Sequence, residues 1–167
     1  THDFGRVHGL GPAKAAELAA AMELARRIRE RAQDPGEKLD APAKVWARLE
    51  PFAAGLAVEK CWVLCLNRRN RLLALHEVSS GTATSALLHP REVFRHALKH
   101  AASAAIVAHN HPSGDPTPSP ADRAVTRQLA DAGRVVGVEL LDHVVVGRPE
   151  ADPAGKGWFS FGEAGLI

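Results

Sequence analysis

The sequence predicts an α/β protein whose mixed sheet is covered by helices on its faces. Two observations predict this class. Short apolar segments, several of them rich in valine, alternate along the chain with segments of strong helix formers. The hydrophobic fraction of 46% and the charged fraction of 24% are those of a globular protein, and 167 residues suffice for one well-buried domain with a modest appendage. Wholesale disorder and collagen-like repetition are therefore excluded.

The first part of the chain predicts a helical segment that is separate from the main domain. Residues 11–31 contain Ala, Leu, Glu and Arg without a helix breaker, and Pro12 suits a first helical position. Residues 34–42 mix Asp, Pro, Gly, Glu and Lys, a composition typical of a linker. We therefore expect a helical segment over residues 1–33, a linker over 34–42 and the main domain over 43–167.

Within the main domain, the hydrophobic pattern predicts alternating helices and strands. The expected helices cover residues 43–49, 90–101 and 119–132, with Gly133 as the stop of the last one. The expected strands cover residues 61–66, 71–78, 103–108, 135–141 and 144–146, and residues 158–161 are expected to add a short edge strand. The polar turn 67–70 is expected to join the first two strands into a hairpin.

Composition also narrows the function. No uninterrupted apolar run approaches the roughly 20 residues that cross a bilayer, and no basic segment leads into an apolar stretch near the start, so we expect a soluble, cytoplasmic protein. Lys plus Arg 21 against Asp plus Glu 19 gives a net charge of +2, too small a balance to mark a nucleic-acid binder. Cys61 and Cys65 are four residues apart in a predicted strand, too far for a disulfide, and we expect them in the core.

The chemistry is concentrated where an apolar strand meets a loop rich in Pro, Gly, Ser and Thr. His109 and His111 are two residues apart at this strand end, so both imidazoles can face the same side while Asn110 faces the other. Asp122 falls in the first turn of the following helix, where the loop can bring its carboxylate back beside the strand end. Two imidazole nitrogens and one carboxylate oxygen suit tetrahedral zinc with a fourth position open to water, an arrangement typical of catalysis.

A purely structural interpretation stands beside this one. Ser119, Pro120 and Asp122 together make a good helix start, with a Ser N-cap, Pro at the first position and an acid at the positive end of the helix dipole. The two histidines could each hydrogen-bond to loop carbonyls. The combination of all these residues in one strand, loop and helix start favours a metal site.

The pattern His-x-His-x7-Ser-x2-Asp resembles the JAMM (MPN-plus) zinc metalloprotease motif. The longer string AHNHPSGDPTPSPAD, with EVSSGT and HPREVF upstream and LLDHVVVG downstream, resembles the RadC family from about Ala43 to the C-terminus. The opening GLGPAKAAELAAAMELARR is similar to the second half of the helix-hairpin-helix region that precedes the RadC core. We expect the chain to begin inside that region, and DNA contact through this partial segment is an open expectation.

The resemblance implies a three-layer α/β/α architecture of the JAMM and cytidine-deaminase type, and a Zn2+ ion held by His109, His111 and Asp122. It also implies that Ser119 helps to stabilise the developing oxyanion. As an N-cap, the same hydroxyl accepts a hydrogen bond from a backbone amide, and a hydroxyl can accept and donate at once.

Hydrolysis also requires a general base near the attacking water, and two carboxylates are candidates. Glu59 precedes the strand 61–66, the position from which JAMM proteins usually present their catalytic glutamate. Glu77 lies near the end of the second strand and is the alternative. Either residue could instead be an exposed charge at a strand end.

Two further groups of histidines attract attention. His143 follows Asp142 in a predicted strand, and it is a candidate for contact with a metal ligand or for a proton relay, although a structural hydrogen bond is the alternative. His96 and His100 share a face of the predicted helix 90–101. No acid supports a metal site there, so we interpret them as part of a solvated helix face.

The sequence therefore predicts a zinc-dependent hydrolase in which metal-activated water attacks an amide or isopeptide-like bond of a peptide or protein substrate. The alternative is a DNA-repair-associated protein that binds DNA or acts as a metal-dependent nuclease. Neither the substrate nor the oligomeric state follows from the sequence.

Overall fold

The computed structural model describes residues 11–33, 36–81 and 88–167. The chain divides into two units, residues 1–35 and 36–167. In the first unit, α1 covers Pro12–Gln33, so the predicted helix is confirmed and extends by two residues. Pro12 is the first residue of this helix, as expected.

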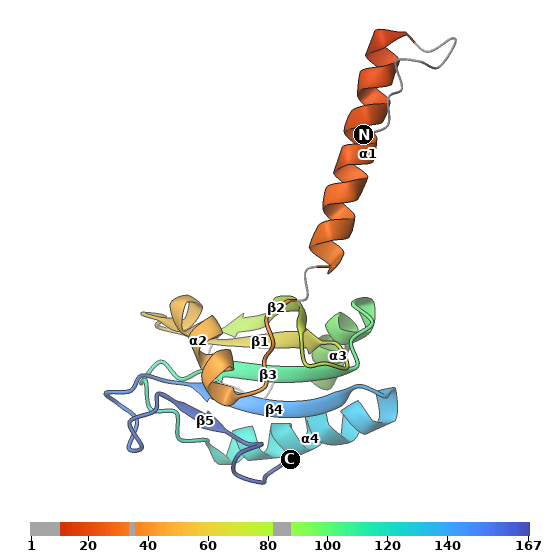
Figure 1. The fold of residues 1–167 in the computed structure, drawn as a ribbon. Coiled ribbons are helices and arrows are strands. Elements are labelled where there is room, and N and C mark those ends of the chain that lie inside the picture. Colours follow the sequence, from red (N-terminus) through yellow and green to blue (C-terminus); the bar gives the residue numbers. More distant parts are fainter. Residues whose placement is uncertain (1–10, 34–35, 82–87) are drawn as a thin grey trace. The chain divides into compact units, whose positions relative to one another are not determined.

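The second unit is built on a five-stranded mixed sheet with the order β2-β1-β3-β4-β5 (Figure 1). The strands are β1 Glu59–Leu66, β2 Leu72–Gly81, β3 Ala104–Asn110, β4 Glu139–Val146 and β5 Trp158–Ser160. β3 pairs with β4 in parallel, and the other neighbouring pairs are antiparallel. The predicted hairpin is present, because β1 and β2 pair across the turn that follows Leu66.

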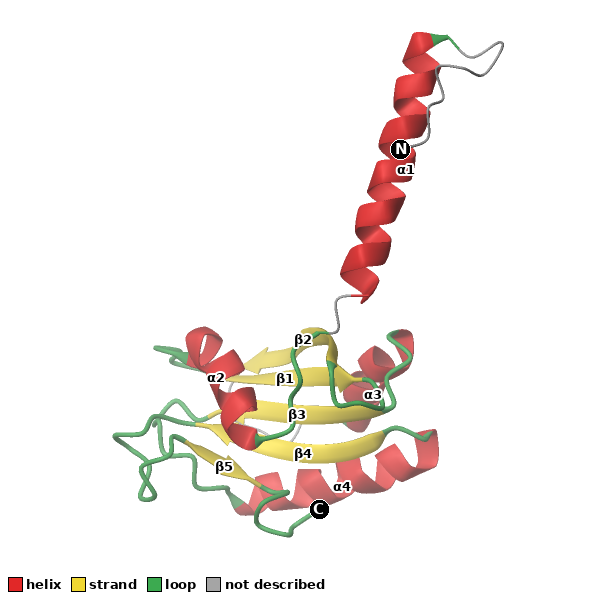
Figure 2. Ribbon diagram, viewed as in Figure 1, coloured by secondary structure: helices red, strands yellow, loops and turns green. Residues whose placement is uncertain are grey.

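Helices cover both faces of this sheet (Figure 2). The helices are α2 Pro42–Ala53, α3 Pro90–Lys99 and α4 Pro120–Val136. Val45 and Leu49 of α2 pack against one face together with Trp62 and Leu64, whereas α3 and α4 bury their apolar sides on the other face with Val63 and Val107. The predicted α/β class with a mixed sheet between helical layers is confirmed.

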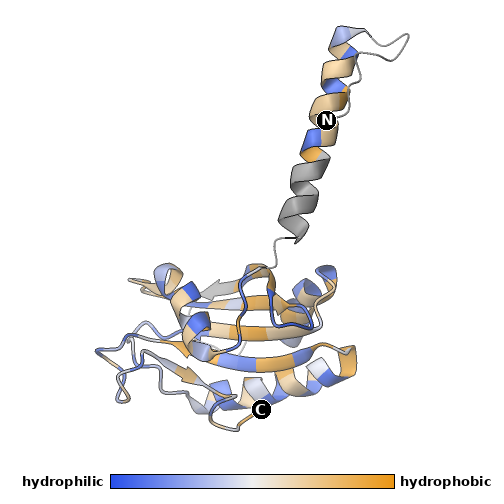
Figure 3. Ribbon diagram, in the orientation of Figure 1, coloured by the Kyte–Doolittle hydropathy of each residue, from blue (hydrophilic) through white to orange (hydrophobic). Residues whose placement is uncertain are grey.

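The central strands carry most of the core. All seven residues of β3 are buried, and the apolar bands in Figure 3 run along β1, β3 and β4. Cys61 and Cys65 are buried on one face of β1, as expected, and no disulfide joins them. Because β3 has no exposed face, His109 and Asn110 at its end are held by close packing as well as by hydrogen bonds.

Several predicted elements are longer in the structure, and two of them matter for the site. The predicted helix 43–49 extends to Pro42–Ala53, and the strand predicted from Cys61 begins at Glu59, which pairs with Gly81 of β2. The second difference brings Glu59 onto the sheet itself. A residue at a strand position has a fixed direction, so Glu59 points to the same face as Cys61.

The prediction for the region after Ala132 is wrong. Gly133 does not stop α4, which continues through Val135 and Val136 and ends at Gly137, where φ is +73°. Gly133 is required for packing instead, because a Cβ there would lie 2.5 Å from the Val138 carbonyl oxygen and 3.1 Å from the Phe94 ring. The two strands predicted over 135–141 and 144–146 are one strand, β4.

In the described part of the chain, no helix combines the length and the apolar character that would be needed to cross a membrane.

Candidate metal centre

The two histidines of the motif meet at the end of β3. His109 is the second-last residue of the strand and is fully buried, whereas His111 follows the strand and is half-buried. Their Nε2 atoms lie 3.1 Å apart. The backbone of His111 remains tied to the sheet, since its amide donates to the Val146 carbonyl.

Asp122 approaches the same point from the first turn of α4. Ser119 is the N-cap, and its hydroxyl accepts a hydrogen bond from the Asp122 amide, while the Asp122 carboxylate accepts one from the Ser119 amide. This reciprocal capping box fixes the side chain of Asp122. Asp122 Oδ1 lies 3.3 Å from His109 Nε2, and Oδ2 lies 3.6 Å from His111 Nε2.

These three residues form a group suited to a metal ion. One ligand atom from each of His109, His111 and Asp122 can be chosen so that all lie within 4.8 Å of one another. Two nitrogens and one oxygen around a common point match the preference of zinc and similar divalent transition metals. The Asp122 carboxylate therefore belongs to the helix cap and to the metal group at the same time.

A chain of buried hydrogen bonds fixes the tautomer of His109. The Thr126 hydroxyl donates to the Asp122 carbonyl at 2.6 Å, so its contact with His143 Nδ1, also 2.6 Å, requires that nitrogen to donate. Neutral His143 then accepts through Nε2 from His109 Nδ1 at 2.9 Å. This leaves His109 Nε2 without a proton, and its lone pair faces His111 and Asp122.

His111 is oriented in the same manner from the loop. Its Nδ1 lies 2.8 Å from the Asp115 carbonyl, which can only accept, so the proton of neutral His111 is on Nδ1. Two Nε2 lone pairs 3.1 Å apart repel each other unless a cation or a proton lies between them. The donor set therefore fits a bound metal ion, and the orienting partners resemble the hydrogen bonds that usually hold metal-binding histidines.

The electrostatics agree with this assignment. Burial lowers the pKa of His109 to about 4, although Asp122 opposes the shift, and burial holds the pKa of His143 well below its usual value. Burial would also lower the pKa of His111, but the neighbouring Asp122 carboxylate and the Asp115 carbonyl outweigh it and raise that pKa. Burial opposes ionisation of Asp122, yet His111, His109 and Ser119 together lower its pKa. Asp122 is thus ionised and His109 is neutral.

Comparison with known proteins places the chain in a family. A family model described as the RadC-like JAB domain matches residues 39–166. The chain belongs to the RadC family. It is 45% identical over 163 residues to a UPF0758 protein of Symbiobacterium thermophilum, covering 96% of this chain and 65% of the relative. It is 41% identical over 142 residues to a UPF0758 protein of Methanosarcina barkeri, covering 85% of this chain and 62% of the relative. A UPF0758 protein of Xanthomonas oryzae is 48% identical over 155 residues, which cover 92% of this chain and 68% of the relative.

The match thus covers less than two thirds of the length of the first two of these relatives. The predicted membership in the RadC family is confirmed, and the metal group lies inside the region that the family model matches.

The two candidate bases of this RadC-family chain lie on opposite faces of the sheet. Glu59 shares the face of Cys61, which pairs with His109, and Glu59 Oε1 lies 3.8 Å from His109 Nε2. Burial raises the pKa of Glu59 above its ordinary value, although His111 opposes the shift. Glu77 pairs with Trp62, points to the face that α2 covers, and forms an exposed ion pair with Lys60 at 2.9 Å. The structure brings Glu59 to the metal centre and leaves Glu77 outside it.

Ser119 and His143 also lie at the centre. The Ser119 hydroxyl donates to Asp122 Oδ2 at 2.6 Å, so its proton is engaged by the carboxylate. His143 contacts His109 directly and stacks on Phe161, with ring centroids 4.9 Å apart. Asp142, its neighbour, points elsewhere and accepts hydrogen bonds from Ser160 and Gly162.

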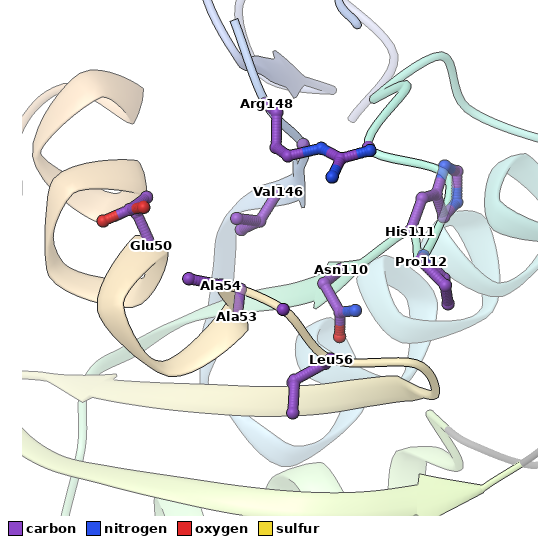
Figure 4. Close-up of a pocket in the computed structure, with 12 residues that line it drawn as sticks. Glu50, Ala53, Ala54, Leu56, Asn110, His111, Pro112, Val146 and Arg148 are labelled. Carbon is purple, nitrogen blue, oxygen red and sulfur yellow. The ribbon is translucent and has the colours of Figure 1, made fainter.

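A groove beside the centre reaches His111 (Figure 4). It has a volume of about 110 Å³ and lies between the end of α2 and the turn after β4. Ala53, Ala54 and Gly55 form one wall, while His111 and Pro112 lie opposite. Arg148 stands at its rim and donates to the Ser113 carbonyl.

Sequence reasoning missed Thr126, and for Asn110 it predicted the direction of the side chain but not its contacts. Thr126 lies one helical turn after Asp122, and this spacing was the available signal that both face the sheet. The side chain of Asn110 does turn away from the two histidines, as expected, but it contacts the segment that carries Glu59.

Proposed function

We propose that this RadC-family chain is a metal-dependent hydrolase of the JAMM type that cleaves an amide or isopeptide-like bond, with Zn2+ as the metal. One observation carries the proposal. The Nε2 atoms of His109 and His111 and the carboxylate of Asp122 converge on one point, and a further carboxylate, that of Glu59, lies beside them outside the ligand group. A structural metal site has no need of this additional acid.

His109, His111 and Asp122 would hold the metal. When bound, such an ion lowers the pKa of a coordinated water to about 7 and polarises a substrate carbonyl. Two neutral imidazoles and one carboxylate would neutralise only part of the charge of a divalent ion. The remaining positive charge is what polarises the water and the carbonyl. His143 and Thr126 keep the lone pair of His109 directed at the centre.

Glu59 is the proposed general base. Its half-buried carboxylate accepts a proton from the water nucleophile and returns that proton to the leaving nitrogen, which converts a poor leaving group into an amine. The burial that raises its pKa brings the group closer to the pH at which it must both accept and release a proton.

Ser119 is the proposed donor to the oxyanion. Its proton now points to Asp122 Oδ2, so the hydroxyl must rotate toward the substrate during the reaction. Binding of the metal by Asp122 withdraws charge from that oxygen and favours this rotation. The hydroxyl oxygen can continue to accept from the Asp122 amide, which preserves the helix cap.

The groove supports a peptide or protein as the substrate class. Its volume of about 110 Å³ suits a single side chain or the end of a chain, and its wall of very small residues leaves His111 accessible from the side of α2. Because the match covers less than two thirds of several relatives, the activity and partners of the whole protein are proposals as well. The DNA-processing alternative is not favoured, because no described residue outside this hydrolase-like group supports it.

The test measures hydrolysis of a library of fluorogenic peptide and isopeptide substrates by the zinc-loaded protein. Glu59→Gln is expected to retain the metal and to reduce turnover by about 10²–10⁴-fold, the range of a general base. Glu77→Gln is the matched control, since it removes the alternative carboxylate on the opposite face, and it is expected to keep activity.

Equal activity of Glu59→Gln and the unaltered protein would contradict the assignment of the base. Cleavage of no amide bond by a protein with a full complement of zinc would contradict the hydrolase proposal itself.

A further inference from the structure

Asn110 connects β3 to the first residues of β1. The antiparallel ladder between these strands ends at the pair Cys61 and His109. Beyond it, the Lys60 amide donates to Asn110 Oδ1 at 2.8 Å, and Asn110 Nδ2 donates to the Val58 carbonyl at 3.2 Å. The side-chain amide thus replaces the backbone peptide group that would have continued the ladder.

The orientation of this amide is fixed by its partners. A backbone N–H can only donate and a carbonyl can only accept, so Oδ1 must face Lys60 and Nδ2 must face Val58. Asn110 is 2% exposed, and in Figure 4 its side chain is directed toward the segment that leads from Leu56 into β1. No other common side chain of this length offers both a donor and an acceptor in this geometry.

The two hydrogen bonds bracket Glu59. Val58 and Lys60 are its chain neighbours, and their polar groups that face β3 are the ones that Asn110 binds. On the side of β1 that faces β2, Glu59 pairs with Gly81. With its neighbours fixed on both sides, the Glu59 side chain is directed to the face on which Oε1 lies 3.8 Å from His109 Nε2.

From this geometry we infer that Asn110 is a positioning residue that holds Glu59 at the metal centre. The inference rests on the proposed role of Glu59 as general base. In this arrangement, His109 and His111 are directed at the metal site from one face. Asn110, which lies between them, fixes the proposed base on the neighbouring strand. A residue without a side-chain amide at position 110 would keep the spacing of the two histidines but would not fix Glu59.

The test uses the protein loaded with Co2+ in place of zinc, whose visible spectrum changes when a coordinated water loses a proton. A carboxylate beside that water disfavours its ionisation. Glu59→Gln is therefore expected to lower the pH midpoint of the spectral change by about one unit. Asn110→Ala is expected to give a shift in the same direction, and the double variant is expected to match Glu59→Gln alone.

Amide hydrogen exchange supplies a second readout that needs neither substrate nor cobalt. The Lys60 amide is expected to exchange at least tenfold faster in Asn110→Ala than in the unaltered protein, since each 1.4 kcal/mol of lost protection gives a factor of ten. Asn67→Ala is the matched control. Asn67 also accepts from two backbone amides, those of Arg69 and Arg71, but at the far end of β1.

The outcomes separate the two claims. Three results would each overturn the positioning role of Asn110. They are an unchanged pH midpoint of the cobalt spectrum in Asn110→Ala, additive shifts in the double variant, and loss of the metal from Asn110→Ala. If Glu59→Gln itself leaves the midpoint unchanged, the proposed general base is wrong and the inference about Asn110 falls with it. A shift with Glu59→Gln that Asn110→Ala reproduces, with Asn67→Ala unchanged, supports both.

Discussion

The described part of the chain contains two clusters of three histidines, and one of them is the candidate metal centre. The first cluster is His109, His111 and His143, with Asp122 beside it. The second, which we call the surface cluster, consists of His76 on β2, His96 on α3 and His100 at the C-cap of α3. His76 Nε2 lies 2.8 Å from His100 Nε2, and the rings of His76 and His96 stack with centroids 4.4 Å apart.

The surroundings of the two clusters differ. The surface cluster is half-buried rather than fully solvated, in contrast to the expectation for His96 and His100. Its charged neighbours are Arg95 and Lys99, together with Glu92, which pairs with Arg95. Burial together with nearby positive charge lowers the pKa of His76 and of His96. At the metal centre, Asp122 supplies a compensating negative charge, and buried partners determine which nitrogen of His109 and of His111 carries a proton.

The comparison teaches that proximity of imidazoles does not by itself make a metal site. A divalent ion requires lone pairs that are already directed at one point, and an anionic ligand such as Asp122 strengthens its binding. Within the described residues, His109, His111 and Asp122 are the group that satisfies this requirement.

The largest expected difference between the clusters concerns the stability of the metal-free protein in acid. His109 has an unfolded pKa of about 6.5 and a folded pKa lowered to about 4. The folded chain therefore binds fewer protons, so stability is present above pH 6.5 and is lost as the pH falls toward 4. We expect His109 to account for about 3 kcal/mol of this loss.

Urea unfolding in the presence of a chelator, at pH 7 and pH 4.5, measures this effect. The drop in the free energy of unfolding is expected to shrink in His109→Asn and to persist in His100→Asn. The comparison of variants is needed because His111, whose pKa is raised, contributes in the opposite sense. An identical pH dependence in His109→Asn and the unaltered protein would show that the buried histidine is not held neutral.

The next effect concerns the orientation of His109. Thr126→Val keeps the shape of the side chain but removes the hydroxyl that accepts from His143. The proton of His143 can then move to Nε2 and displace the proton of His109 onto the nitrogen that faces the metal. We expect metal affinity to fall by about 10–100-fold, the usual cost of losing such a partner.

Competition with a fluorescent zinc chelator measures that affinity. His100→Asn, which breaks the hydrogen bond to His76 in the surface cluster, is the matched control and is expected to leave the affinity unchanged. Unaltered affinity in Thr126→Val would mean that the hydrogen-bonded chain from Thr126 to His109 does not set the tautomer.

The sequence predicts those features of the site that depend on local spacing. His109 and His111 converge because residues two apart in a strand share a face, and Asp122 joins them because the loop is short and Ser119 caps the helix. Strand alternation also predicted that Asn110 turns away. Each of these follows from a few consecutive residues.

The remaining features depend on how distant segments pair. Which of Glu59 and Glu77 lies beside the histidines depends on the register of β1 against β2 and β3, which places the two side chains on opposite faces. The contact between His143 and His109 arises because β4 lies parallel to β3. Similarly, Gly133 suggested a helix stop by its residue type, and only the packing against Phe94 shows why it lies inside α4.

The most direct test of the metal centre is the metal content of the purified protein by elemental analysis, with His109→Ala, Asp122→Ala and His100→Ala measured in parallel. We expect about one zinc per chain in the unaltered protein and in His100→Ala, and none in the other two variants. Zinc retained in His109→Ala and Asp122→Ala, or lost only from His100→Ala, would contradict the assignment and place the metal at the surface cluster.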